Sequence, residues 1–175
     1  MEKLILVDLD DNEIGSGEKL KVHEEAKLHR AFSIFIVHEG KMLIQKRAKK
    51  KYHSGDLWAN AVCSHPRKGE TLFEATHRRL QEEAGFDTEL KELFHFVYKT
   101  DFKNKLSEYE FDHVVIGDFD GKPKYDPNEA SDYKWIELDK LKNDLRLHPE
   151  KYASWFLIAC PRVFEILETS SDLLF

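Results

Sequence analysis

The segment from Thr71 to Gly85 constrains the fold most, because it carries the start signal, the periodicity and the stop signal of one helix. Residues 71–74, Thr-Leu-Phe-Glu, fit a capping box, in which a threonine and a glutamate satisfy each other's backbone N–H groups. Gly85 is the residue type that most often ends a helix in the left-handed conformation. We therefore predict an amphipathic helix here. Its apolar stripe comprises Leu72, Phe73, Thr76, Leu80 and Ala84.

Patterns typical of strands lie on both sides of this helix in the sequence. Runs rich in β-branched and aromatic residues, bounded by turn residues, predict strands. These runs cover residues 4–9, 31–38, 42–46, 57–62, 93–100, 109–117 and 132–136, and two helices are predicted after them at 138–148 and 150–168. Strands and helices are intermixed, with no internal repeat and no low-complexity linker. We therefore predict an α+β fold with mixed β-sheets flanked by helices, in which residues 1–175 form a single domain.

The composition is that of an ordinary globular protein. Hydrophobic residues make up 41% of the chain and charged residues 34%, and no apolar run reaches the ~20 residues that span a bilayer. The net charge of −6 argues against a general nucleic-acid binder. The two cysteines are too few for a disulfide framework, and the N-terminus lacks a signal-peptide pattern. We expect a cytoplasmic protein with no membrane span and no nucleic-acid partner.

A compact basic segment lies at residues 45–51, Gln-Lys-Arg-Ala-Lys-Lys-Lys. Charge runs of this kind are often no more than solvated surface. The alternative is a site for a small anion, and the position of the basic segment shortly before Cys63 favours that alternative.

One cysteine and one histidine lie two residues apart in the stretch 58–69. Pro66 disfavours the helical conformation at His65 and so predicts a loop there. Side chains two residues apart on an extended segment project to the same side. Cys63 is therefore a candidate acid/base group and His65 a candidate metal ligand. Cys160, in an apolar helical stretch, is expected to be inert packing.

Glu108 and Glu110 lie at the start of a predicted strand, and their spacing projects both carboxylates from the same face. With His23, His29 and His65 they would form a mixed nitrogen and oxygen site that suits Mg²⁺, Mn²⁺ or Zn²⁺. The absence of thiolate pairs argues against a cysteine-type structural zinc site. Spacing alone leaves a second interpretation open, in which the histidines are hydrogen-bonded or at the surface and the strand face is merely polar.

Residues 64–86, SHPRKGETLFEATHRRLQEEAGF, resemble the Nudix box, whose pattern is Gly, five residues, Glu, seven residues, then Arg-Glu-apolar-x-Glu-Glu-x-Gly-apolar. The chain matches this pattern with Glu70, Arg78, Leu80, Glu82, Glu83, Gly85 and Phe86. It has Ser64 where the pattern has Gly, and Arg79 where the pattern has Glu. In Nudix hydrolases that Glu belongs to the carboxylate cluster that gathers Mg²⁺. A guanidinium there would oppose metal binding while offering paired donors to a phosphate.

The branch with this departure is the type 1 isopentenyl diphosphate isomerase family, and the chain is similar to it over nearly its whole length. The segments that carry the resemblance are LHRAFS at 28–33, QKRAKKK at 45–51, WANAVCSHP at 58–66, YKTD at 98–101, SEYE at 107–110 and ASWF at 153–156. The resemblance implies a Nudix fold and an isomerase of isopentenyl and dimethylallyl diphosphate, working by protonation and deprotonation through a tertiary carbocation. It further implies a role in isoprenoid biosynthesis, a prenyl diphosphate substrate, and a monomer or weak dimer.

The same resemblance implies roles for individual residues. Cys63 and Glu110 would be the two catalytic acid/base groups, with Tyr98 hydrogen-bonded near Glu110. The implied ligands of a buried Mn²⁺, Zn²⁺ or Mg²⁺ are His23, His29, His65, Glu108 and Glu110. Glu83 would bind the Mg²⁺ that bridges protein and diphosphate. The implied substrate contacts are Lys19, Arg47, Lys51 and Arg79 for the diphosphate and Trp155 for the hydrocarbon tail.

Two other functions fit parts of the sequence. A Nudix hydrolase of nucleoside or prenyl diphosphates is disfavoured by Arg79, and it leaves Cys63 with the Glu108 and Glu110 pair unexplained. A catalytically silent module that senses diphosphates would keep the fold and the basic segment. The retained acid/base and aromatic residues argue against such a module.

Overall fold

Strand β3 (His29–His38) lies at the centre of the molecule, because its residues are apolar enough to be buried on both faces. A strand covered on both sides has a nearly continuous hydrophobic run, as residues 31–37 do. One edge of β3 pairs in parallel with β8 (Ser107–Gly117). Along its other edge β3 pairs in turn with β1, β6 and β4, all antiparallel.

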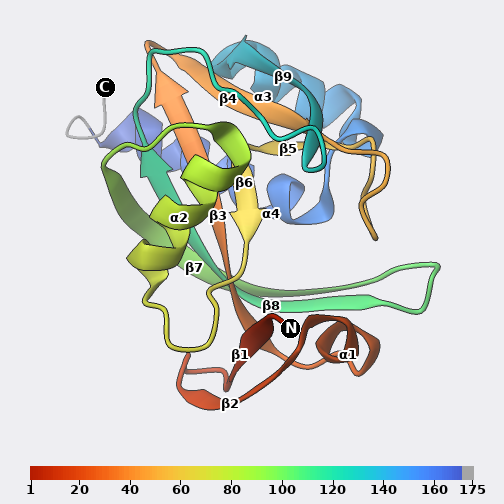
Figure 1. The fold of residues 1–175 in the computed structure, drawn as a ribbon. Coiled ribbons are helices and arrows are strands. Elements are labelled where there is room, and N and C mark those ends of the chain that lie inside the picture. Colours follow the sequence, from red (N-terminus) through yellow and green to blue (C-terminus); the bar gives the residue numbers. More distant parts are fainter. Residues whose placement is uncertain (171–175) are drawn as a thin grey trace.

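The computed structural model describes residues 1–170, whose strands join into one mixed sheet (Figure 1). The other strands are β1 (Lys3–Val7), β2 (Glu13–Glu18), β4 (Lys41–Arg47), β5 (Trp58–Asn60), β6 (Val62–Ser64), β7 (Leu90–Asp101) and β9 (Ala130–Glu137). β2 pairs with β1, β5 and β9 pair with β4, and β7 pairs with β8, all antiparallel. The predicted mixed sheet flanked by helices is confirmed.

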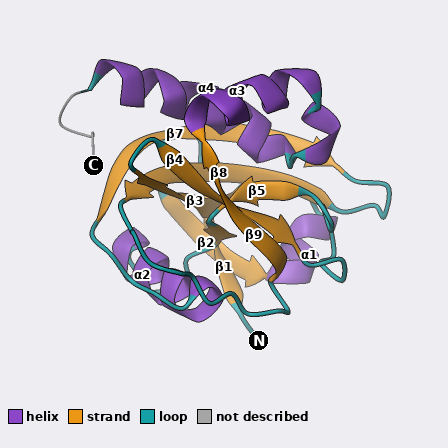
Figure 2. Ribbon diagram, turned by 90° about the horizontal axis from the view of Figure 1, so that it is seen from above, coloured by secondary structure: helices purple, strands orange, loops and turns teal. Residues whose placement is uncertain are grey.

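Helices cover both faces of the sheet (Figure 2). α2 (Leu72–Ala84) lies on one face, and α3 (Leu138–Leu147) and α4 (Ser154–Thr169) lie on the other. The short helix α1 (Lys19–Glu24) follows β2, and a 3₁₀ turn (Pro149–Lys151) precedes α4. Within residues 1–170, every helix is too short or too polar to cross a bilayer.

Each helical layer closes its own hydrophobic core. Under α4, Phe156 stacks on Phe35 of β3 with ring centroids 5.8 Å apart. Under α2, Leu80 joins a buried cluster with Ile34 of β3 and Val115 of β8. The central strands are thus fixed from both sides, which makes them a rigid support for side chains at their ends.

The sequence accounts for both ends of α2. Thr71 Oγ1 accepts a hydrogen bond from the Glu74 N–H (3.2 Å), and Glu74 Oε2 accepts one from the Thr71 N–H (2.8 Å), which is the predicted capping box. Gly85 follows the helix with a φ of 74°, and a Cβ at this position would lie 2.8 Å from the Lys124 carbonyl oxygen. Backbone conformation and close approach both exclude a larger residue here.

The predicted apolar stripe of α2 is wrong at one position. Phe73 is 41% exposed, whereas Leu80 and Thr76 are completely buried. Phe73 points to the same side of the helix as Leu80, seven residues later, but it lies in the first turn of α2, where that side is open to solvent. Leu72 packs against the core, and Glu83, eleven residues later on the same side of the helix, is buried where α2 borders the cavity described below.

Three other details differ from the sequence-based predictions. Residues 57–62 do not form one strand, because β5 pairs with β4 whereas β6 pairs with β3, and Ala61 interrupts them. α4 begins at Ser154 and not at residue 150, since residues 149–151 form the 3₁₀ turn. No pattern in the sequence predicts α1, because six residues are too few to show helical periodicity.

Burial along α2 predicts unequal effects of two substitutions. Leu80→Ala should lower the free energy of unfolding by about 2–5 kcal/mol, because it leaves a cavity between the helix and the sheet. Phe73→Ala should lower it by no more than about 1 kcal/mol, because this ring is already in contact with water. Urea unfolding followed by circular dichroism measures both values. Equal losses would place Phe73 in the core and contradict its exposure.

Candidate active site

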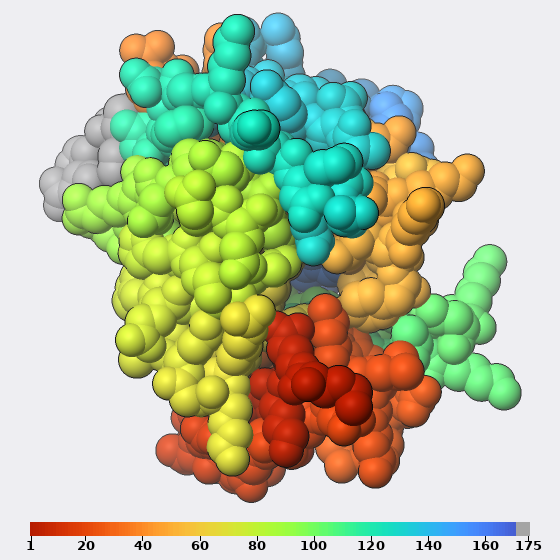
Figure 3. Space-filling view, viewed as in Figure 1, coloured from red at the N-terminus to blue at the C-terminus, as the bar shows by residue number. Residues whose placement is uncertain are grey.

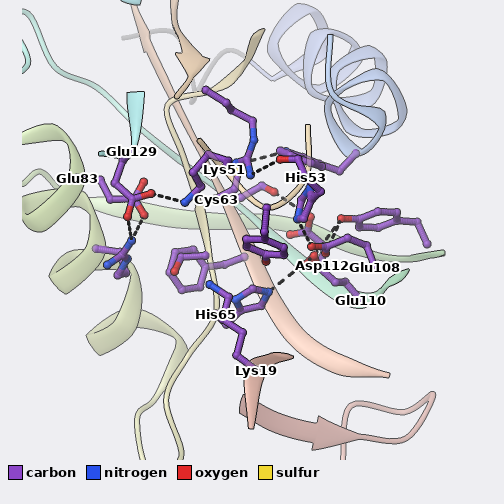
Figure 4. A pocket seen from close by; sticks show the side chains of 18 residues that line it. Lys19, Lys51, His53, Cys63, His65, Glu83, Glu108, Glu110, Asp112 and Glu129 are labelled. Atoms are coloured by element: carbon purple, nitrogen blue, oxygen red, sulfur yellow. Dashed lines mark hydrogen bonds and ion pairs between the residues drawn. The ribbon is translucent and has the colours of Figure 1, made fainter. Parts of the chain in front are cut away.

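A cavity opens where the N-terminal segment, the basic segment and the loop before β9 meet, and atoms of the C-terminal helix are visible in its depth (Figure 3). The predicted site residues that line it are Lys19, Arg47, Lys51, Cys63, His65, Arg79, Glu83, Tyr98, Glu108, Glu110 and Trp155 (Figure 4). His23 and His29 do not line it, but their ring centroids lie 5.8 and 5.0 Å from that of His65. The fold therefore brings all of the predicted residues into one region.

Strand β8 forms one wall of the cavity. Glu108, Glu110 and Asp112 line the cavity, and their spacing places all three on one face of the strand. Val114 and Ile116 continue that face into the core under α4. Burial raises the pKa of Asp112 to about 8. The motifs do not include Asp112, although the same two-residue spacing that pairs the glutamates extends to it.

Cys63 and Glu110 come from strands on opposite edges of β3. Cys63 on β6 pairs with Ser33 of β3, and Glu110 on β8 pairs with His29 of β3. The two side chains therefore face the same cavity from two sides. Such an arrangement can deliver a proton to one end of a small substrate and remove a proton from the other.

The Cys63 thiol is held by two neighbouring side chains. Its Sγ donates to Asn60 Oδ1 (3.1 Å) and accepts from Trp155 Nε1 (3.0 Å). Asn60 is fixed in turn, because its Nδ2 donates to the carbonyl oxygens of Ile34 (3.1 Å) and Val62 (2.9 Å). Asn60 is the only amide side chain in the apolar run 58–62, which could have marked it in the sequence. A buried amide usually serves a structural or catalytic purpose, because its polar atoms must be hydrogen-bonded.

Burial raises the pKa of the Cys63 thiol to about 12, although the nearby Arg47 guanidinium opposes the shift. Cys63 is therefore protonated at neutral pH and suited to donate a proton. Cys160 lies completely buried in the core under α4, where burial raises its pKa well above the usual range. Its predicted role as packing agrees with this position.

Tyr98 lies beside both glutamates of β8. Its hydroxyl donates to Glu110 Oε1 (3.0 Å) and is 3.4 Å from Glu108 Oε2. Burial raises the pKa of Tyr98 well above its usual range, so the hydroxyl keeps its proton as a hydrogen-bond donor. The predicted contact between Tyr98 and Glu110 is present in the structure.

His23, His29, His65 and Glu108 form a buried set of potential metal ligands, with one ligand atom of each lying within 4.8 Å of the others. His23 Nδ1 faces the Lys19 carbonyl oxygen at 2.6 Å, and His29 Nδ1 faces that of Lys27 at 2.8 Å. A carbonyl oxygen only accepts, so both Nδ1 atoms carry protons and both Nε2 atoms are directed to the cluster. Such contacts orient histidine ligands in metal sites.

The remaining contacts of this cluster fit a divalent cation. His29 Nε2 is buried with no hydrogen-bond partner. In the neutral ring His23 Nε2 is an acceptor, yet it lies 3.2 Å from Glu108 Oε1, which is another acceptor. A cation between two such atoms would satisfy both of them. Glu110 lies at the edge of this set, with Oε1 3.8 Å from His65 Nε2.

The charges of the cluster also suit a metal ion. Burial lowers the pKa of His29 and of His65 to about 3, so both rings are neutral and offer a lone pair. Burial opposes ionisation of Glu108, but the neighbouring histidines, among them the hydrogen-bond donor His53, outweigh it and hold the pKa of Glu108 well below the usual range. Neutral imidazoles and an ionised carboxylate are the forms that bind divalent metals.

The other end of the cavity holds a network of ion pairs that includes a residue outside the predicted set. Glu129, in the loop before β9, pairs through Oε2 with Lys51 Nζ (2.6 Å) and through Oε1 with Arg79 (3.3 Å). Arg79 also contacts Glu83 and Glu82. Burial raises the pKa of Glu83 to about 7. No motif marks Glu129, and only the approach of its loop to α2 brings it into the site.

The resemblance of α2 to the Nudix box has a structural counterpart. Arg78 pairs with both oxygens of Glu70, at 2.6 and 2.9 Å. Glu70 Oε2 also accepts from the Arg67 N–H at 2.7 Å, which ties the loop before α2 to the helix. Glu70 and Arg78 therefore hold the loop before α2, whereas Arg79 and Glu83 face the cavity.

The fold and the box together define a Nudix-domain protein, and residues 27–156 match the family model described as NUDIX domain. The chain is 50% identical over 157 residues to an isopentenyl-diphosphate Delta-isomerase of Serratia proteamaculans, covering 89% of this chain and 88% of that protein. It is 51% identical over 156 residues to isopentenyl-diphosphate Delta-isomerase 2 of Photorhabdus laumondii, with the same two shares. The chain belongs to the isopentenyl-diphosphate Delta-isomerase family.

Solved structures with a similar fold are much more distant in sequence. A protein of Deinococcus radiodurans has a TM-score of 0.76 at 21% identity and covers 92% of this chain and 98% of its own. A MutT NUDIX hydrolase of Burkholderia pseudomallei has a TM-score of 0.63 at 22% identity, with coverages of 78% and 98%. These similarities concern the fold alone and confirm its Nudix architecture.

The histidine cluster predicts a loss of metal binding on one substitution. His29→Gln should reduce the divalent ion retained after dialysis to a small fraction of the wild-type value, because it removes the unpartnered Nε2 ligand. Metal analysis by plasma mass spectrometry measures the retained ion. His77→Gln is the matched control, since His77 lies on α2 and pairs with Asp87 away from the cluster. Equal retention in wild type and His29→Gln would contradict the assignment.

Proposed function

We propose that this protein is a metal-dependent isomerase that interconverts isopentenyl diphosphate and dimethylallyl diphosphate and so supplies prenyl units for isoprenoid synthesis. The observation that carries the proposal is that Cys63 and Glu110 face one cavity from opposite edges of β3. Moving a double bond from the terminal to the internal position adds a proton at one carbon and removes a proton from another. Two acid/base groups on either side of the substrate meet this requirement.

The surroundings of Cys63 and Glu110 support their proposed roles. The protonated Cys63 thiol lies against Trp155 and Asn60, and the Glu110 carboxylate accepts a hydrogen bond from Tyr98. These contacts set the direction of each acid/base group toward the cavity. Because the reaction is reversible, each group donates a proton in one direction and accepts it in the other.

Trp155 is the proposed contact for the hydrocarbon tail. Its ring is buried in the cavity wall, and the Arg47 guanidinium lies 4.9 Å from the ring centroid, so this ring already accepts a cation. The face of an indole can stabilise a positive charge by about 2 kcal/mol or more when water is excluded. A tertiary carbocation formed beside Trp155 would gain this stabilisation.

The buried ligands His23, His29, His65 and Glu108, joined by Glu110, would hold a divalent ion. Mg²⁺, Mn²⁺ and Zn²⁺ all suit this set of nitrogen and oxygen donors. When bound, such an ion would lower the pKa of the Glu110 carboxyl group. The chain contributes the orientation of the ligands, through the carbonyl contacts of His23 and His29.

The basic end of the cavity would bind the diphosphate. The proposed contacts are Lys19, Arg47, Lys51 and Arg79, and Glu83 would bind a Mg²⁺ ion that bridges protein and substrate. Holding the diphosphate there fixes the tail between the acid/base groups, which saves much of the entropic cost of alignment. Arg79 stands where hydrolases of this fold have a metal-binding carboxylate, so the site favours holding a diphosphate over cleaving it.

The setting of the protein is also part of the proposal. We infer that the protein works in the cytoplasm as a monomer or weak dimer, with a small prenyl diphosphate as its partner. Both cysteines are free thiols, which fits a reducing compartment.

Incubation with isopentenyl diphosphate and Mg²⁺ in deuterated water tests the activity. Dimethylallyl diphosphate should form and carry deuterium, because the added proton comes from a group that exchanges with solvent. Mass spectrometry and deuterium NMR measure the product. Release of phosphate without an isomer would favour a hydrolase, and binding without turnover would favour a module that only senses diphosphates.

Substitutions at the two acid/base positions should nearly abolish turnover. Cys63→Ala and Glu110→Gln should each lower kcat by a factor of about 10²–10⁴, the usual contribution of a positioned acid or base. Cys160→Ala is the matched control and should stay near wild type, because this thiol lies in the core away from the cavity. Comparable losses of kcat in the Cys63 and Cys160 variants would contradict the assignment of catalysis to Cys63 and of packing to Cys160.

A further inference from the structure

His53 is a buried residue of the site that no motif includes. It follows the basic segment in the loop between β4 and β5, and only 7% of it is exposed. Its side chain lines the cavity near Glu108 (Figure 4). Trp155 lines the same cavity. A buried imidazole at this position needs hydrogen-bond partners, and its two nitrogens have different ones.

The hydrogen-bond partners of His53 show which of its two ring nitrogens carries the proton. Nε2 lies 2.5 Å from Glu108 Oε1, and Nδ1 lies 3.1 Å from Ser54 Oγ. The ionised carboxylate can only accept, so the Nε2 proton is donated to Glu108. The serine hydroxyl can donate to Nδ1. A neutral His53 therefore satisfies both contacts and places a hydrogen bond on a carboxylate of the metal cluster.

Packing holds the His53 ring in this orientation. The ring stacks on Phe102 with centroids 4.6 Å apart and planes inclined by 11°. Its plane is nearly perpendicular to those of Trp155 and Tyr52, with ring centroids 5.9 and 4.4 Å away. Its backbone carbonyl oxygen is 3.4 Å from an Arg47 nitrogen. Rotation of the ring away from Glu108 would disturb several of these contacts.

We propose that His53 is a positioning residue for the metal site, which holds Glu108 in the orientation that binds the ion. Glu108 lies between two histidines, because its Oε1 is 3.2 Å from His23 Nε2 on one side and 2.5 Å from His53 Nε2 on the other. His23 is one of the four residues whose ligand atoms lie close enough together to bind one ion, and His53 is not among them. His53 therefore acts on the ion through Glu108, as outer hydrogen-bond partners of metal ligands do.

The position of His53 also joins the metal cluster to the hydrocarbon end of the cavity. The His53 ring contacts Glu108 through Nε2 and packs perpendicular to the ring of Trp155. Loss of the Nε2 donor should therefore release Glu108, whereas loss of the ring alone should affect Trp155. Variants that separate the donor from the ring distinguish the positioning role from packing.

The experiment compares His53→Gln with His53→Asn. The glutamine amide nitrogen reaches the place of Nε2, whereas the asparagine amide, shorter by one methylene group, reaches only the place of Nδ1. Both variants lose the aromatic ring, so their difference reports the hydrogen bond to Glu108. Apoprotein is titrated with Co²⁺ against a competing chelator, and the visible absorption of the bound ion gives both the affinity and the coordination.

His53→Asn should weaken Co²⁺ binding by about 10- to 100-fold, the usual effect of losing an outer hydrogen-bond partner, whereas His53→Gln should restore most of that loss. His148→Asn is the control for a surface histidine, since the exposed His148 lies between α3 and the 3₁₀ turn, and it should bind as wild type. Equal affinities of the Gln and Asn variants would overturn the positioning role, whether both are weak or both are unchanged.

The inference rests on the proposed metal-dependent function, and the titration separates the two. If wild type binds Co²⁺ and isomerises its substrate while both variants bind equally, only the role of His53 fails. If wild type binds no Co²⁺ in the cluster, the metal site and the role of His53 fail together. Circular dichroism of each variant establishes that the compared proteins are folded.

Discussion

Strand β3 runs between β8 on one edge and β6 on the other, and the site depends on this pairing. The register sets Cys63 beside Ser33 and Glu110 beside His29, so two residues far apart in sequence face one cavity. Both helical layers cover β3, which leaves its neighbours little freedom to slip. A shift of register by one residue would turn these side chains to the opposite face. The separation of Cys63 and Glu110, the proposed acid/base groups, is thus a property of the sheet.

The cavity combines opposite charges instead of presenting a simple basic surface. Four cationic side chains line it, Lys19, Arg47, Lys51 and Arg79, together with the five carboxylates of Glu83, Glu108, Glu110, Asp112 and Glu129. Burial raises the pKa of Asp112 to about 8 and that of Glu83 to about 7, so part of this negative charge is absent at neutral pH. The carboxylates also hold the cations in place, as Glu129 does for Lys51 and Arg79.

The helix α2 shows how one scaffold can support different chemistry on diphosphates. Its capping box, its terminal glycine and the pair of Glu70 with Arg78 preserve the architecture of the Nudix box. Within that architecture Arg79 faces the cavity beside Glu83. The same position thus carries a guanidinium, paired with glutamates, instead of a carboxylate. Distant Nudix structures share the fold at 21–22% identity, while the isomerases share about half of the residues.

The sequence by itself determined the ends of α2, the strand pattern around it and the spacing that aligns Glu108 with Glu110, because capping and alternation are local rules. It also marked Cys63 and His65 by their spacing in an extended stretch, and the family resemblance then implied their roles. Only the tertiary structure brought in His53 and Glu129 and turned Phe73 toward solvent. The contacts of His53 and Glu129 join segments separated by fifty residues or more, and no local pattern encodes the packing of two loops against a helix or a strand.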